Sequence, residues 1–548
     1  MFLALGIVLA TAGISAWYLY HWSVFFNSDF AMIGLIGERI LKTGETHLYV
    51  PMVGYQGLLI EGYLSAFLFQ LFGTSPQTLH LTAVLAYVVF VFWFYLSVKV
   101  WFDRKTAQLS VLFICLSSPL FFAHVLRTQP NYPETFAVGC FLFWAFKRFM
   151  ESGRKKFFYW GCLAAGFGFY LYGQIIYFFL CVFISFLIHR LSWEPLRKII
   201  RNQKLNYLLG AGLIVSVLPT MTFSGLRIPG PTLGVVCFLV WFCKQVMNFR
   251  EPIRRFILKN TKPFIVGALL FVVGYFPSLY HRVVLGRFAK SGIKLIKFSE
   301  EFWLNLKLLL VHAGDFLIGS EYFAISVVLA VVSVGVIAWF VLSECKHKPR
   351  AVSPFVLLGP VILVGFLSSR SVCEGFSLRY ILGLHLVLSV SLALLMNKLL
   401  SKSRALAVIF LLIWMGNGLY SNVRAPWVWS KARSYSQLTR WEDVQGLVEY
   451  LDKIKLPVGY SDYWVAYLTN FVTRGRLVLE PLYTNYLPFF EETVKKEARI
   501  VMIKDKDRLS AGPDMTSNPR EVSINNITYR VIDETEVQFW KVWILEKT

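Results

Sequence analysis

FFNSDFAMIGLIGERI, residues 25–40, follows directly on an apolar run that begins at Phe2. A run of this length is close to what is needed to span roughly 30 Å of hydrocarbon, so Asp29 stands where the chain leaves a membrane. The residues after Asp29 read as a helix with little charge of its own. The stretch predicts a first membrane span followed by a carboxylate at the boundary between lipid and water.

The rest of the chain has the composition of a polytopic membrane protein. Of its 548 residues, 56% are hydrophobic and 16% are charged, whereas a soluble protein has about 25% charged residues. The net charge of +23 lies in short clusters between apolar runs, which fits membrane orientation better than nucleic-acid binding. Most of the eight cysteines fall within or beside apolar runs, and no CxxC or Cys/His metal spacing occurs, which argues against a disulfide framework.

The apolar runs predict thirteen helical spans within residues 1–421. An odd number places the two ends on opposite sides, and a cytoplasmic N-terminus gives the inner loops an excess of Lys and Arg, as the positive-inside rule requires. The first run lacks a basic n-region and a clear cleavage site, so we expect it to be retained. The spans are predicted near residues 2–20, 81–98, 107–122, 134–148, 157–171, 173–189, 205–222, 232–248, 263–280, 323–343, 352–369, 377–396 and 404–421.

Two long outer loops are predicted, residues 21–80 and 281–322. The first contains the apolar run 57–73, which we interpret as an interfacial or re-entrant helix. If this run were a span, the next five basic loops would lie on the outer side of the membrane, against the positive-inside rule. Glu61 would also face lipid in such a span, at high cost. The second loop reads as a basic stretch leading to an amphipathic helix in the plane of the interface.

After residue 421 the composition changes, and residues 425–548 are predicted to form a soluble α/β or α+β domain outside the cytoplasm. WEDVQGLVEYLDKIK (441–455) and FFEETVKKEA (489–498) have helical character. Three segments read as strands, namely PVGYSDYWVAYL (457–468), RLVLEPL (476–482) and ARIVMIKD (498–505).

Asp29 has two interpretations. Asn27, Ser28 and Asp29 are all good N-cap residues, so Asp29 could simply cap an interfacial helix. Alternatively, its carboxylate accepts a proton from the hydroxyl or amine of an acceptor molecule. The head group of a lipid-linked substrate would lie at this depth.

Two arginines are candidates for phosphate binding, because a planar guanidinium forms paired hydrogen bonds with phosphate. Arg379 begins an apolar run, where an arginine is costly unless it is paired, bound to a ligand or extended to the interface. Arg127 lies in the second outer loop, HVLRTQPNYPETFAVG (124–139), and could instead pair with Glu134. Glu134 itself would complement the dipole of the next helix. Walker-type phosphate signatures are absent, so no nucleotide site is evident.

Three stretches resemble a known family. SDFAMIGLIGERILKTGE (28–45), YQGLLIEGYLSAFLFQLFGTSPQTLHLTAVL (55–85) and LRYILGLHLVLSVSLALL (378–395) are similar to motifs of bacterial membrane glycosyltransferases of the GT-C fold. The likeness is to the protein-mannosyltransferase-like family 39 and the aminoarabinose transferases of lipid A. Two motifs depart from the pattern. Asp29-Phe30 replaces an Asp-Glu pair, and Gly54 to Gly57 replaces a Pro-Pro.

The resemblance implies a polyprenyl-phosphate-sugar donor and an inverting transfer to a glycan, lipid or protein acceptor. The reaction would take place on the periplasmic side of a bacterial inner membrane, with no nucleotide cofactor and with metal dependence left open. Asp29 would be the general base or the group that orients the acceptor, and Arg379, with Arg127 as second choice, would neutralise the departing phosphate. The candidates for lining the substrate site are Glu134, Glu61, Tyr55, Gln174 and Tyr380.

A flippase or transporter of lipid-linked glycans is the alternative function. Such a protein would need charged residues along a pathway in mid-span, whereas the predicted spans are nearly free of them and the polar groups gather on one face. A non-catalytic scaffold would leave the coincidence of Asp29, Glu134 and Arg379 on that face unexplained. The sequence therefore favours an enzyme that works at the interface.

Overall fold

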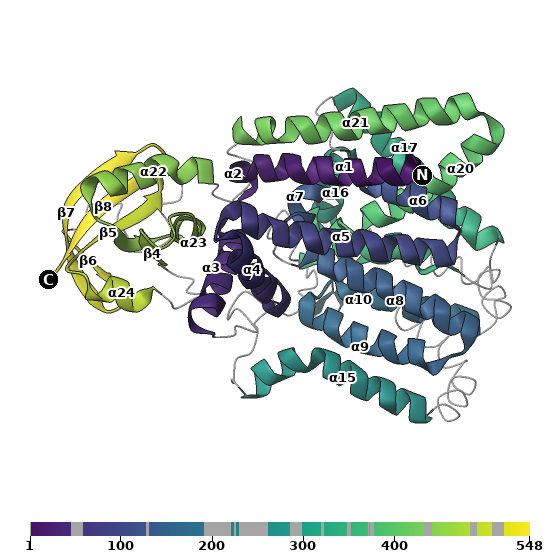
Figure 1. The fold of residues 1–548 in the computed structure, drawn as a ribbon, viewed down its shortest axis with the longest axis horizontal. Helices are drawn as coiled ribbons and strands as arrows, with labels where there is room; N and C mark the ends of the chain where they lie inside the picture. Colours follow the sequence, from purple (N-terminus) through teal and green to yellow (C-terminus); the bar gives the residue numbers. More distant parts are fainter. Residues whose placement is uncertain are drawn as a thin grey trace.

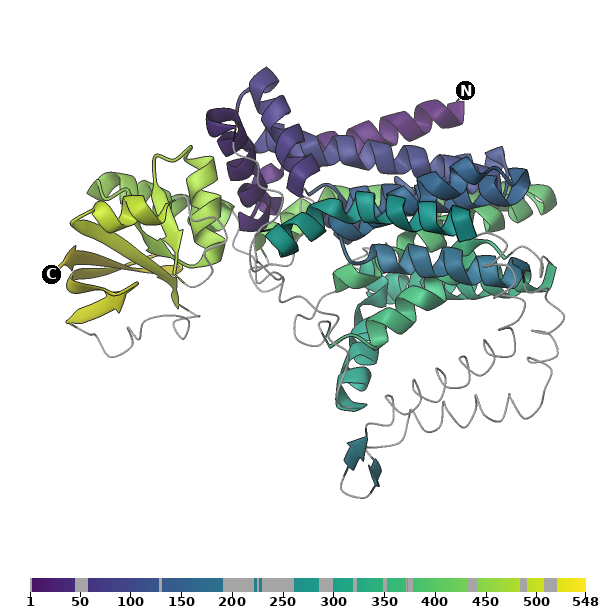
Figure 2. The same ribbon diagram turned by 90° about the horizontal axis from the view of Figure 1, so that it is seen from below.

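The computed structural model shows a bundle of long helices with an α/β domain at one end (Figure 1). The α/β domain adjoins α3 (Ser28–Thr43) and α4 (Leu58–Phe72), and the N-terminus lies toward the other end of the bundle in both views (Figure 2). The residues described are 2–44, 58–127, 131–190, 221–223, 226–228, 261–284, 299–318, 323–347, 352–370, 372, 378–431, 441–482, 490–506 and 520–548.

The bundle is made of helices whose ends follow local sequence signals. Ser75 accepts a hydrogen bond from the Thr78 amide at 3.0 Å and so caps α5, while Asp103 caps α6 in the same way at 2.8 Å. The elements are α1 (Phe2–Tyr20), α2 (Trp22–Phe25), α5 (Pro76–Trp101), α6 (Arg104–Ile114), α7 (Pro119–Val125), α8 (Tyr132–Ser152), α9 (Lys155–Leu171), α10 (Ile175–Arg190), the hairpin β1 (Met221–Phe223) and β2 (Leu226–Ile228), α15 (Thr261–Val284), α16 (Ser299–Ile318), α17 (Phe323–His347), α18 (Pro354–Leu367), η1 (Leu378–Ile381), α20 (Leu384–Lys402) and α21 (Arg404–Lys431).

Four of the described helices are long and apolar enough to cross a membrane: Pro76–Trp101, Thr261–Tyr280, Leu384–Lys402 and Arg404–Val428. The pair α6 and α7, bent by 92°, is a fifth candidate if it forms one broken span. The predicted helical membrane architecture with a β-containing C-terminal domain is confirmed, but the count of thirteen spans is not. Most of the predicted spans 205–222 and 232–248 lies outside the described residues.

The apolar run 57–73 forms α4, a helix of 15 residues that is not among the candidate spans. The amphipathic segment of the second outer loop forms α16, which is fastened to the end of α18. Asn305 donates hydrogen bonds to the carbonyls of Phe366 and Ser369, and Glu301 pairs with Arg370 at 3.3 Å. The interfacial placement of α4 and α16 stays a prediction.

The C-terminal domain is a six-stranded sheet with helices, in the strand order β4-β3-β5-β8-β7-β6. Strand β3 (Val458–Ser461) pairs in parallel with β4 (Val478–Pro481) and with β5 (Arg499–Asp505). The remaining pairings are antiparallel, through β6 (Glu521–Ile524), β7 (Ile527–Val537) and β8 (Trp540–Lys547). The helices are α22 (Trp441–Ile454), α23 (Tyr463–Val472) and α24 (Glu491–Lys496).

Two sequence-based expectations for this region are corrected. Residues 457–468 were expected to form a strand, but only 458–461 do, because the Asp462 carboxylate caps a new helix by accepting from the amides of Trp464 and Val465. The last bundle helix was expected to end near residue 421, but α21 continues to Lys431. The other predicted strands and both predicted helices of this domain are confirmed as β4, β5, α22 and α24.

The bundle and the C-terminal domain share one hydrophobic core. Phe26, Phe30 and Ile33 on the bundle side are buried together with Val465 and Phe471 of α23. The Phe471 ring lies 5.7 Å from the ring of Phe26. It also covers Gly34, where a Cβ atom would come within 2.3 Å of the Phe471 ring. A junction packed this closely holds α23 in a fixed position on α3.

Candidate active site

Asp29 lies in the first turn of α3, but it is not the residue that caps the helix. Asn27 is the N-cap, and its side-chain oxygen accepts from the Phe30 amide at 3.2 Å. Gly44, with φ of 70°, closes the other end of α3. The capping interpretation of Asp29 is therefore wrong, and its carboxylate is available for another contact.

That contact comes from the C-terminal domain. The hydroxyl of Tyr463 donates to Oδ1 of Asp29 at 2.5 Å. The neighbouring Ser28 donates to the Trp464 carbonyl at 2.7 Å and accepts from the Leu468 amide at 3.0 Å. Asp29 is 8% exposed. The predicted catalytic carboxylate thus lies at the junction of the two domains.

The two predicted phosphate-binding arginines both lie near His124. Arg127 lies 2.8 Å from His124, measured between Nη2 and Nδ1. Arg379 is close enough to interact electrostatically with the same imidazole. Because Arg127 follows α7 and Arg379 belongs to η1, the fold brings cations from distant parts of the sequence to one place, as an anion site requires.

Gln174 and Tyr380, both predicted to line the substrate site, lie next to Arg379. Gln174 occupies the turn between α9 and α10, and its amide donates to the Arg379 carbonyl at 3.4 Å. The Arg379 guanidinium lies over the Tyr380 ring, 5.4 Å from its centroid. Through these contacts Gln174 and Tyr380 both help to hold Arg379 in place on η1.

The remaining carboxylates of the prediction, Glu61 and Glu134, face each other. Glu61 is 1% exposed and Glu134 is 9% exposed. Within the described part of the chain, the Glu61 carboxyl has no partner other than the Glu134 carboxyl. Burial raises the pKa of the Glu61 carboxyl well above its usual range, and the facing Glu134 raises this pKa further. The alternative pairing of Glu134 with Arg127 is not among the contacts of the described residues.

The site residues therefore fall into three groups. Asp29 contacts Tyr463 and neither arginine among the residues that the structure describes. Arg127 and Arg379 form the second group, with His124, and the two glutamates form the third. Helix α4 joins the first group to the third, since it packs against α3, which carries Asp29, and itself carries Glu61. Gly37 of α3 allows the close approach, because a Cβ there would lie 2.4 Å from the Ser65 hydroxyl of α4.

Two residues of the site, Tyr463 and His124, were not singled out from the sequence, and one predicted residue cannot be placed. Tyr55 lies outside the described residues. Tyr463 was missed because its segment was interpreted as a strand, although Asp462 followed by aromatic and apolar residues also fits a helix start. His124 was noted only as part of its loop. Within the described ranges, no group of three or more His, Cys, Asp or Glu side chains is arranged to hold a metal ion.

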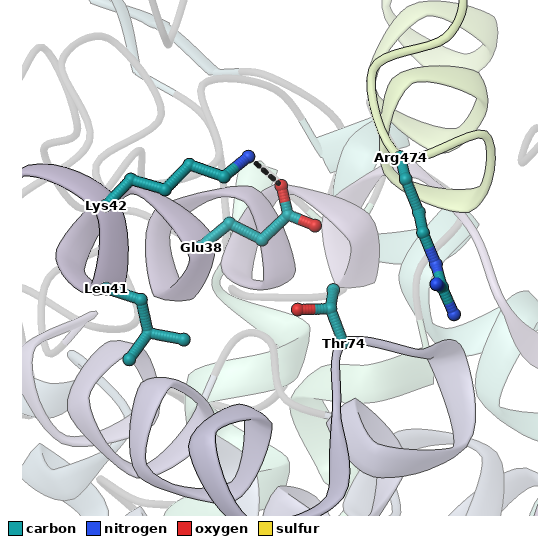
Figure 3. A pocket seen from close by; sticks show the side chains of 5 residues that line it. All are labelled: Glu38, Leu41, Lys42, Thr74 and Arg474. Carbon is teal, nitrogen blue, oxygen red and sulfur yellow. Dashed lines mark ion pairs between the residues drawn. The ribbon is translucent and has the colours of Figure 1, made fainter.

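A separate pocket of about 360 Å³ lies beside the domain junction (Figure 3). Its lining residues are Glu38, Leu41, Lys42, Thr74 and Arg474. Lys42 pairs with Glu38 at 3.5 Å, and burial raises the pKa of the Glu38 carboxyl, against the opposing effect of Lys42. The pocket contains none of the predicted site residues.

Taken together, these features define a polytopic helical membrane protein in which the Asp29 carboxylate lies where the bundle meets an α/β domain. Residues 59–223, less than half of the chain, match the family described as dolichyl-phosphate-mannose-protein mannosyltransferase. No curated protein matches the chain.

Two solved structures resemble the whole chain. ArnT from Cupriavidus metallidurans, bound to undecaprenyl phosphate, has 11% sequence identity and a TM-score of 0.50, over 98% of this chain and 97% of that chain. The archaeal oligosaccharyltransferase AglB from Archaeoglobus fulgidus, in complex with an inhibitory peptide and a dolichol-phosphate, has 12% identity and a TM-score of 0.48, over 92% of this chain and 69% of that chain. The likeness to ArnT establishes the fold, so the predicted resemblance to GT-C membrane glycosyltransferases is confirmed at that level.

Proposed function

We propose that this protein transfers a sugar from a polyprenyl-phosphate donor to a hydroxyl or amine acceptor. The observation that carries the proposal is the presence of both Arg127 and Arg379 near His124. Two guanidinium groups at one place suit a lipid-linked phosphate. The family match and the ArnT and AglB structures, both bound to polyprenyl-type phosphates, support the same donor class.

In the proposed reaction the acceptor atom forms a bond to the anomeric carbon, with inversion, as the bond from that carbon to the phosphate oxygen breaks. The phosphate oxygen keeps the electron pair and leaves as polyprenyl phosphate, whose growing charge Arg379 and Arg127 stabilise. Asp29 takes the proton of the acceptor. Glu134, Glu61, Tyr55, Gln174 and Tyr380 are proposed to line the substrate site, on the outer face of a bacterial inner membrane.

The proposal is tested with purified full-length protein and synthetic polyprenyl-phosphate donors that carry a labelled hexose or pentose. We expect labelled sugar to appear on a component of a cell-envelope extract, together with equimolar release of polyprenyl phosphate. A nucleotide-sugar donor is the control, and it should give no product. Absence of transfer from every lipid-linked donor would overturn the proposal.

The same preparation, placed in liposomes, tests the alternative function. A flippase would carry the labelled lipid to the opposite leaflet without forming a new glycosidic bond. Movement of the label between leaflets, with the donor chemically unchanged, would favour transport over transfer.

A further inference from the structure

The C-terminal domain faces the bundle near the carboxyl end of strand β3. In an open sheet with parallel strands, side chains that meet ligands or partners gather at the carboxyl ends of those strands. Strand β3 lies between its two parallel neighbours, β4 and β5. Its carboxyl end runs through Ser461 and Asp462 directly into Tyr463, so this edge of the sheet delivers Tyr463 to α3.

Tyr463 is held in place by its own surroundings as well as by Asp29. Its ring makes edge contacts with the rings of Trp464 and Tyr467, at centroid distances of 4.8 Å and 5.3 Å. The Asp462 cap fixes the first turn of α23. A phenol restrained in this way is a preorganised donor for the carboxylate that it meets.

The contact engages only one oxygen of Asp29. Oδ1 accepts from the Tyr463 hydroxyl, and among the described residues Oδ2 makes no hydrogen bond. A carboxylate bound through one oxygen is restrained in its orientation and keeps the other oxygen for a second partner. The hydrogen bonds of Ser28 with Trp464 and Leu468 and the stacking of Phe471 on Phe26 hold the domain on the bundle independently of this bond. The stability of the junction therefore does not require the hydrogen bond between Tyr463 and Asp29.

We infer that Tyr463 is a positioning residue of the transfer site, which fixes the Asp29 carboxylate so that Oδ2 faces the acceptor. The inference rests on the proposed function. It makes the C-terminal domain a working part of the site, because the domain supplies the group that orients the base. A misoriented base would lower the rate of transfer without weakening the binding of the donor.

The test compares Tyr463→Phe with Ser28→Ala in the full-length protein. The phenylalanine keeps the ring contacts and removes only the hydroxyl. The alanine removes two hydrogen bonds across the same junction and leaves Asp29 untouched. We expect Tyr463→Phe to lower kcat by about 10- to 100-fold with the donor KM within about 2-fold of the wild type. Ser28→Ala should lower the Tm and keep the wild-type kcat.

A third variant, Tyr463→Gln, retains a hydrogen-bond donor and should recover part of kcat relative to Tyr463→Phe. Full kcat in folded Tyr463→Phe would overturn the inference while leaving transfer itself intact. Equal loss of kcat in Tyr463→Phe and Ser28→Ala would also overturn it, since both would then act through the junction. If the wild-type protein transfers no sugar, the proposed function fails instead, so the two failures are distinguishable.

Discussion

Capping and candidate catalysis fall on different residues at the start of α3. Asn27 makes the cap, while Asp29, two residues further along the chain, accepts from Tyr463. A side chain in this first turn also benefits from the helix dipole when it is negatively charged. The separation of the two roles allows each to be tested by one substitution.

Asp29→Asn should yield a folded protein with a transfer rate lower by about 100-fold or more, because an amide cannot take a proton. The amide oxygen can still accept from Tyr463, so we expect a near wild-type Tm. The matched control is Asn27→Ala, which should cost about 1 kcal/mol of stability and preserve transfer. Sugar transfer and thermal unfolding of both variants give the answer, and undiminished transfer by Asp29→Asn would remove the catalytic role.

Arg379→Ala should weaken transfer from the lipid-phosphate donor by about 2 to 4 kcal/mol in the transition state, since one charge-assisted contact with the leaving group is lost. Arg379→Lys should recover only part of this, because an ammonium lacks the planar fork. The measurements are kcat/KM and the direct binding of undecaprenyl phosphate. Wild-type values for the alanine variant would assign Arg379 to a structural role beside Gln174 and Tyr380.

Glu61→Gln should make stability less dependent on pH. The folded-state pKa of Glu61 is raised, so the folded protein binds the proton more tightly, and stability falls as pH rises above the unfolded value of about 4.3 toward the folded value. The neutral amide removes this loss. We expect the variant and the wild type to have similar Tm values near pH 4, with the variant becoming the more stable as pH rises. A wild-type pH profile in the variant would contradict the prediction.

At the scale of elements, the junction depends on α23 lying close against α3. Gly34 permits this approach, because the Phe471 ring occupies the space that any larger side chain would need. Phe471 is itself 1% exposed and has Phe26 and Phe69 as ring neighbours. The ring therefore has little freedom to move aside.

Gly34→Ala should destabilise the protein by about 1 to 3 kcal/mol, through overpacking against Phe471. Gly161→Ala in α9 is the control, since the structure leaves open space at that position and alanine favours the helix by about 0.5 to 1 kcal/mol. The stabilities of the two variants are measured by thermal unfolding and by limited proteolysis of the junction. Equal stability of the two variants would show that the α3–α23 contact is loose.

At the scale of the whole molecule, contacts between helix ends indicate which connections share an end of the bundle. The Asn131 side chain at the start of α8 donates to the Leu171 carbonyl at the end of α9. The turn at Gly153 between these helices must therefore lie at the opposite end, away from the C-terminal domain (Figure 1). The exposed basic residues Arg154, Lys155 and Lys156 follow that turn.

The predicted topology places this basic turn in the cytoplasm and the C-terminal domain outside. A phosphatase fused after Thr548 should be active, whereas one inserted at Gly153 should be inactive. A fluorescent reporter that matures only in the cytoplasm should give the reverse pattern at both positions. Activity of the phosphatase at Gly153 would reverse the proposed side of the reaction.

The sequence alone determined the membrane character, the existence of most helices and the residue types available to the site. These properties are local: hydropathy follows from each run of residues, and Asp29, Arg127 and Arg379 could each be singled out by position relative to an apolar run. The start of α23 was missed because alternating aromatic and apolar residues in 457–468 satisfy both strand and helix patterns, and the Asp462 cap decides between them.

Only the tertiary structure decided which of these residues meet. Arg127 and Arg379 converge on His124, Glu61 faces Glu134, and Tyr463 reaches Asp29 across 434 positions of sequence. No local pattern specifies such pairs, because they depend on how whole helices pack, and packing is set by shape at contacts such as Gly34 with Phe471. The sequence could therefore name the candidate base, but only the fold could show that a tyrosine from the last domain holds it.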